Sequence, residues 1–390
     1  MQLKNLVAAL LLLLLIPQLS VLSAQKKEGC RRCEHRGMLQ CKAHSEEIHA
    51  FEKEVLFCAT IAACDRCGGT LMEDCEHCED GPDIAIAAAR RVLIEAWLPP
   101  NRLETHLKRS LPRIETESFH LVVNTGDLKE GRKRVEEHLI AHTVAHDVEL
   151  AAKSMDAHFT LERKDYQSKM RMWIWNNPDD HSAAMTQFLD TGASGDFKML
   201  GRAPVFSVWT EPGLFNTVRS VRTLFTHNAT HMLLSNALFP LWVGDLGGGW
   251  LDAGVGHYYE YEIYKDTRNY CIEESTSTGQ FANGVWRTAV RKHLNKVEEP
   301  ALPRLFLMNT GAMEQYQQAL CWSFFEYLVH NHQPALREIL ADLKAKKKTR
   351  VIMRERLGMD IFGAENAWRA WVEASYPKRG DELRLPPKEK

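Results

Sequence analysis

The chain has 390 residues, of which 45% are hydrophobic and 26% are charged. A chain of this length and composition can bury a substantial core, and we expect two or three domains. Its 49 Lys and Arg residues nearly balance 51 Asp and Glu residues, for a net charge of -2. This balance argues against a nucleic-acid-binding protein, which would carry a basic footprint.

Residues 1–24 have the pattern of a signal peptide. Lys4 precedes an apolar run from Leu6 through Ile16, and small residues lead up to Ala24. Cleavage after Ala24 is predicted, so we expect an exported protein, either periplasmic or secreted. No later run reaches the roughly 20 apolar residues that span a bilayer, so no membrane span is expected after cleavage. The alternative is that this segment remains as an uncleaved anchor.

Eight of the ten cysteines lie between residues 30 and 78, and seven of them form, with His44, two units of the same spacing. The first unit reads C-x2-C-x7-C-x2-H and the second C-x2-C-x7-C-x2-C. Two such turns complete four ligands of zinc-like geometry. We therefore predict a cysteine module over residues 25–80 that holds about two structural zinc ions, with no coordination position open to a substrate. The candidate zinc ligands are Cys30, Cys33, Cys41, His44, Cys64, Cys67, Cys75 and Cys78.

The spacing leaves the pairing of these four turns open. A nested pairing, first turn with fourth and second with third, agrees with it as well as two local sites do. In an oxidising compartment the same cysteines could instead form disulfides. Cys58 fits neither unit and is expected to be a buried, leftover thiol. With Gly37 and the pair Gly68 and Gly69, the units resemble the DnaJ-type C-x-x-C-x-G-x-G zinc module, a resemblance that implies zinc binding.

The remaining pattern predicts an α+β fold, with a small sheet ahead of a mostly helical C-terminal half. A helix over about residues 84–97 ends before Pro99 and Pro100, and residues 81–109 are expected to form a helical linker. After Tyr264 the pattern is almost wholly helical. The other predicted elements are a strand at 119–124, a helix at about 128–153 and strands at 170–175 and 205–210.

Three histidines, His138, His142 and His146, recur every fourth residue on the predicted helix at 128–153. Such a row can bind metal or respond to pH between about 5 and 8. Because Val135 and Leu139 occupy the neighbouring stripe, we interpret the row as a solvated flank beside a packed face.

A second pair of histidines, His227 and His231, lies four residues apart on one predicted helix. This spacing presents two imidazoles to one metal ion, as an H-E-x-x-H helix does. The residue after the first His is Asn228, which has no titratable group where a zinc peptidase has its catalytic Glu. Loss of a positioned general base typically lowers a rate by about 10²–10⁴-fold.

The downstream segment from Trp250 to Glu260 reads W-L-D-A-G-V-G-H-Y-Y-E. With the H-x-x-x-H helix, it resembles the gluzincin (peptidase MA-like) zinc metallopeptidases, whose usual form is W-L-x-E-G-x-A-x-Y-x-E. The resemblance covers roughly residues 110–376 and leaves 377–390 as a polar tail. It places Ala253 where the family has its third zinc ligand. It also implies that the strand at 205–210 is an edge strand and that Tyr316 could stabilise an oxyanion.

A metal site could still be rebuilt from neighbouring residues. His257 is four residues from Ala253 and shares its helix face, and Glu260 continues that face. Three histidines around an open position are a known zinc arrangement, so His227, His231 and His257 are candidate ligands. Otherwise the two histidines of the pair remain as hydrogen-bonded members of a vestigial cleft.

These observations leave three classes of function. The first is an exported, catalytically inactive gluzincin-like protein that binds a peptide or protein partner. The second is a divergent zinc metallopeptidase that uses the rebuilt histidine site, with a base such as Glu260 or Asp252. The third is a structural protein of the cell envelope that is held together by zinc ions or disulfides and binds no other ligand.

Overall fold

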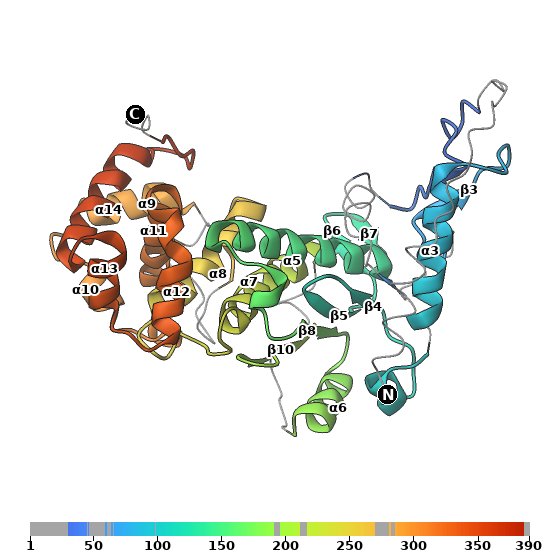
Figure 1. Cartoon of the computed structure of the whole chain (residues 1–390), viewed down its shortest axis with the longest axis horizontal. Helices are drawn as coiled ribbons and strands as arrows, with labels where there is room; N and C mark the ends of the chain where they lie inside the picture. The colour runs from blue at the N-terminus through green and yellow to red at the C-terminus, as the bar shows by residue number, and fades with distance from the viewer. Residues whose placement is uncertain are drawn as a thin grey trace.

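The computed structural model describes residues 30–44, 46, 59–60, 64, 66–97, 99–190, 196–210, 217–269, 281 and 285–385. The expected signal peptide and Cys58 lie outside these residues. Within them the fold is α+β, as predicted. A sheet and its covering helices form the centre, the helical C-terminal half lies at one end, and the cysteine units with helix α3 lie at the other (Figure 1).

The main sheet has six strands in the order β2-β4-β5-β8-β10-β9. Its central strands β5, β8 and β10 run parallel. Strands β4 and β9 pair antiparallel with β5 and β10, and β2 pairs antiparallel with β4. The strands predicted at 119–124 and 170–175 are confirmed as β5 and β8. The bounds are β2 (Ala59–Thr60), β4 (Arg113–Glu115), β5 (Phe119–Asn124), β8 (Met170–Trp175), β9 (Phe197–Met199) and β10 (Val205–Trp209).

Two local predictions are wrong. Strand β10 is not an edge strand, because β9 pairs with it antiparallel after the chain reverses near Gly201, whose φ is +103°. The helix predicted from residue 128 begins only at residue 137. Before it, β6 (Leu128–Glu130) and β7 (Lys133–Val135) form a hairpin around Gly131, whose positive φ of 59° suits a tight turn.

Three long helices form the layer that carries the candidate site. Helix α5 (Glu137–Phe159) packs on the sheet and against α7 (Val218–Asn236) and α8 (Gly249–Tyr264). Its buried face repeats at helical spacing through Ile140, Val144 and Val148. Helix α7 begins at a capping box in which the Thr217 side chain accepts a hydrogen bond from the Ser220 backbone N–H.

The C-terminal half fixes the position of α8, which packs along α11.

No helix in the described part of the chain is both long and apolar enough to cross a membrane. The helices of this half are α9 (Trp286–Leu294), α10 (Leu302–Leu305), α11 (Gln315–His332), α12 (Leu336–Lys344), α13 (Thr349–Leu357) and α14 (Ile361–Ser375). The shorter helices outside it are α3 (Pro82–Trp97), α4 (Arg102–Leu107) and α6 (Pro178–Leu189).

Helix α7 is also held at its C-terminus. The buried ammonium group of Lys344 donates hydrogen bonds to the backbone carbonyls of Ser235, Ala237 and Phe239, at 2.9, 2.6 and 2.6 Å. A cation at this end of a helix satisfies carbonyls that have no partner within the helix and interacts favourably with the helix dipole. The helix that carries His227 and His231 is thus fixed at both ends.

Candidate metal centres

The two cysteine units are related by an approximate internal twofold. Strands β1 (Met38–Gln40) and β3 (Met72–Asp74) occupy the same place in each unit and pair antiparallel. The backbone repeats as well, since the residues just after the first Cys pair of each unit have positive φ. In the first unit these are Glu34 and His35, and in the second they are Gly68 and Gly69.

The antiparallel pair of β1 and β3, called the ribbon below, determines which of the four turns lie together. The first turn precedes β1 and the fourth follows β3, so the ribbon brings them to one end and the second and third turns to the other. The potential ligand atoms accordingly form two groups, each within 4.8 Å. The pairing is therefore nested rather than local. The outer group is Cys30, Cys33, Cys75 and Cys78, and the inner group is Cys41, His44, Cys64 and Cys67.

The sulfur separations fit a metal ion better than a disulfide. The Sγ atoms of Cys33 and Cys78 lie 3.4 Å apart, those of Cys30 and Cys75 3.8 Å, and those of Cys41 and Cys64 3.9 Å. Two thiolates about 2.3 Å from one tetrahedral zinc ion would lie about 3.8 Å apart. A disulfide requires about 2.05 Å, so none of these three pairs is bridged. Both groups could hold a metal ion.

The thiols differ in how readily they ionise without metal. Hydrogen bonds from the backbone N–H groups of Cys33 and Arg32 lower the pKa of Cys30 to about 6. Burial instead raises the pKa of Cys41 and Cys67 in the inner group. A hydrogen bond with the Cys33 thiol also raises the pKa of Cys78 in the outer group. Thiolates are the ligand form, so both groups require a cation to stabilise their deprotonated state.

The H-x-x-x-H pair lies between α7 and α8. The Nε2 atoms of His227 and His231 are 3.1 Å apart, and each Nδ1 faces a carboxylate of α8. Glu260 lies 3.1 Å from Nδ1 of His227 and Asp252 lies 3.0 Å from Nδ1 of His231. Carboxylates in these positions orient the imidazoles of many metal sites. A Cβ atom at Gly256 would approach Nε2 of His231 to 2.8 Å, so glycine keeps the space beside the pair open.

His257 is close to this pair but points elsewhere. Its ring centre is 4.8 Å from that of His227, yet its Nε2 lies 2.8 Å from Oε1 of Gln318 on α11. The three histidines therefore do not converge through Nε2 on one point. His227, His257 and Glu260 instead form a third group of potential ligand atoms within 4.8 Å, all buried.

The cluster combines neutral and ionised groups in a buried volume. Burial lowers the pKa of His227, lowers that of His257 to about 3 and raises that of Glu260 to about 8. Burial also opposes ionisation of Asp252, but attraction to His231 and a hydrogen bond from it hold the Asp252 pKa below its usual value. Neutral imidazoles are the form that binds metal.

Neither Asn228 nor Ala253 offers a group that could act as a general base or bind a metal ion. The side-chain amide of Asn228 donates to the carbonyl of Leu224 in its own helix, at 3.0 Å, and Ala253 is fully buried. The ring of Tyr316 packs against that of His293 on α9, with their centres 5.3 Å apart.

Sequence reasoning missed the residues that hold the cluster in place. Asp252 was considered only as a possible base, yet it binds His231 and accepts a hydrogen bond from Thr310 at 2.8 Å. Gln318, which anchors His257, was not considered. The available signal was a polar residue within or beside an apolar stretch, since Asp252 lies within Trp250–Tyr258 and Gln318 directly precedes Ala319–Leu328.

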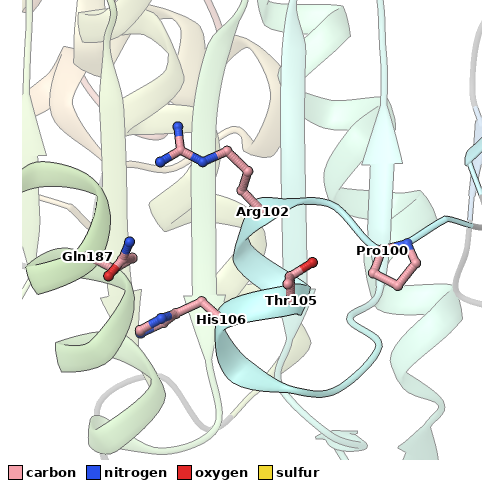
Figure 2. Close-up of a pocket in the computed structure, with 5 residues that line it drawn as sticks. All are labelled: Pro100, Arg102, Thr105, His106 and Gln187. Carbon is pink, nitrogen blue, oxygen red and sulfur yellow. The ribbon is translucent and has the colours of Figure 1, made fainter.

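A surface pocket of about 380 Å³ lies where α4 and α6 meet, and it shares no residue with these groups. Figure 2 shows the polar side chains of Arg102, His106 and Gln187 around it. The Arg102 guanidinium lies 5.5 Å from the centre of the Phe188 ring. Its lining is exposed and the sequence had not singled it out, so we assign it no role.

Comparison with known proteins adds no family assignment. No known family model matches the chain, and no curated protein is detectably similar to it in sequence. The geometry of the two cysteine groups and of the histidine cluster is therefore the basis for the proposed function.

Proposed function

We propose that this chain is an exported binding protein in which a gluzincin-like domain has lost catalysis and a cysteine module holds two structural zinc ions. The observation that carries the proposal is at position 228, where a peptidase requires a base. The Asn228 amide has no titratable group and is bound to its own helix. Ala253, at the position of the third ligand, offers no donor atom.

Exposed apolar side chains support a peptide or protein partner. Leu307 and Phe239 are 84% and 59% exposed, on two loops that meet where the Thr310 N–H donates to the Gly244 carbonyl at 3.1 Å. A contiguous exposed apolar patch commonly marks an interaction site, and we propose that these two side chains belong to one. These loops also support the start of α8, which links them to the histidine cluster.

Peptide binding should depend on the exposed apolar side chains of Leu307 and Phe239. We expect fluorescein-labelled casein peptides to bind saturably, and Leu307→Asp to weaken binding by about tenfold or more because a charge would disrupt an apolar contact. Fluorescence anisotropy measures the affinity. The matched control is Val92→Asp, an equally simple change at a 64% exposed apolar residue on α3, which should have no effect. Binding that is absent, or equally weakened by both variants, would count against the proposal.

Restoring two carboxylates should restore metal binding in the cluster. Asn228→Glu with Ala253→Glu should add about one zinc ion per chain, because a third ligand then joins His227 and His231. Hydrolysis of casein would follow if the new base reaches the bound water. The control is Asn228→Gln with Ala253→Gln, which has the same size without charge. Zinc content is measured by mass spectrometry, and equal zinc in the two double variants would contradict the expected descent from a metallopeptidase.

A second candidate function is a divergent zinc metallopeptidase. It is favoured by the convergence of two Nε2 atoms, the two carboxylates behind them and the space beside Gly256. When bound, zinc would activate water for hydrolysis. This candidate requires the unaltered chain to cleave casein and to lose that activity in His231→Ala, a result that would overturn the inactive proposal.

A further inference from the structure

The histidine row on α5 is not a solvated flank, and His44 of the cysteine module packs against two of its members. His142 is fully buried, and the side chain of His138 is only 11% exposed. The ring of His44, a member of the inner cysteine group, lies 4.9 Å from that of His142 and 5.4 Å from that of His138. Three imidazoles from two parts of the chain thus meet at one junction.

A backbone contact reaches the main sheet from the same part of the module. Strand β2, in the segment between the second and third turns, pairs antiparallel with β4. The segment that contains β2 is a loop whose two ends meet at the inner group, because ligands of this group lie on both sides of β2 in the chain. The inner end of the ribbon is therefore the end that lies beside α5 and is linked through β2 to the main sheet.

The ring geometry places α5 within the immediate surroundings of the inner metal position. Rings whose centres lie about 4.5–7 Å apart in a T-shaped arrangement are in direct contact. The separations of His44 from His138 and His142 fall in this range, so both rings of α5 pack directly against a ligand of the inner group. In addition, Nδ1 of His138 lies 3.2 Å from Oε2 of Glu136, which directs its Nε2 edge away from that carboxylate, as in carboxylate-oriented metal sites.

We propose that the ion of the inner group fastens the cysteine module to α5, with His142 and His138 as positioning residues around the zinc ligand His44. Three thiolates carry one more negative charge than Zn²⁺ neutralises. N–H groups of neighbouring imidazoles stabilise that excess charge in a site from which α5 excludes water. The outer group consists of cysteines alone and lies at the end of the ribbon away from the contact of His44 with α5, so the two ions have different tasks.

The test compares the two ions within one chain. Zinc is withdrawn from the full chain with a colorimetric chelator, and the two release steps are assigned with Cys78→Ser, which removes the outer ion. His142→Asn should weaken the inner ion by about 10–100-fold, the usual effect of losing such a partner, and leave the outer ion unchanged. His146→Asn, one turn further along α5, is the matched control and should change neither.

A second measurement separates fastening from folding. Hydrogen exchange over residues 137–146 should rise when the inner ion is lost in Cys64→Ser, and should stay low when the outer ion is lost in Cys78→Ser. The inference rests on the zinc occupancy proposed above, and an unaltered chain without zinc would overturn both. If the unaltered chain holds two ions, then equal weakening of both ions in His142→Asn, or no change in either, overturns the fastening inference alone.

Discussion

Replacing Cys33 and Cys78 together by serine should leave about one zinc ion per chain, whereas replacing Cys33 and Cys41 together should leave none. Cys33 and Cys78 belong to the same outer group, so both substitutions damage one site. Cys33 and Cys41 belong to different groups, so that pair damages both. A structural zinc site needs all four of its ligands for full affinity.

Mass spectrometry of the intact protein under native conditions measures this stoichiometry directly. Local pairing of the turns would reverse the two results, because Cys33 and Cys41 would then share a site. The energetic effect should be large, since structural zinc contributes about 10–16 kcal/mol of apparent binding free energy at neutral pH. If disulfides replaced zinc, the unaltered chain would contain no metal and would show few free thiols after denaturation.

Replacing Arg287 by methionine should destabilise the helical half by about 3–5 kcal/mol. The guanidinium of Arg287 on α9 makes a two-pronged ion pair with Glu326 on α11, and both side chains are buried. It also donates to the Tyr261 hydroxyl on α8 at 3.0 Å and to the Asp381 carbonyl at 2.7 Å. The substitution would leave the Glu326 carboxylate buried without its partner.

Chemical denaturation followed by tryptophan fluorescence measures this loss, because the Arg287 guanidinium lies 5.7 Å from the centre of the Trp322 ring. Adding Glu326→Gln to Arg287→Met should recover part of the stability, since the unpaired charge is removed. The exposed pair Arg134 and Asp127 is the control, and Arg134→Met should cost no more than about 1 kcal/mol. A similar cost for both arginine variants would show that the buried pair has no special role.

Local sequence patterns correctly predicted the parts of the fold that depend on residues close together in the chain. The runs at 119–124 and 170–175 were recognisable as strands, and the ligand spacing identified all eight members of the two cysteine groups. Four-residue spacing likewise placed His227 and His231 on one face of α7. In these cases periodicity and spacing are enough, because the partners are close in the chain.

Contacts between distant segments could not be predicted in the same way. The nested pairing depends on the direction in which β3 returns along β1, which ligand spacing does not encode. His142 was assigned to a solvated flank because Val135 and Leu139 occupy the neighbouring stripe, whereas the ring of His44 that packs against it comes from the distant cysteine module. The hairpin at 128–135 was missed because the turn at Gly131 interrupts a sequence that otherwise suits a helix.

The nested pairing also sets an order for metal loading. Cys41 and Cys64, the inner sulfurs in contact, are 23 residues apart, whereas Cys30 and Cys75 of the outer group are 45 residues apart. Each doubling of a flexible loop costs about 0.6 kcal/mol of closure entropy, so the inner loop closes more readily. Once it is closed, the segments that remain free between the outer ligands are short. When zinc is scarce, folding chains should therefore fill the inner site first, and the outer site would load onto a ribbon that is already formed.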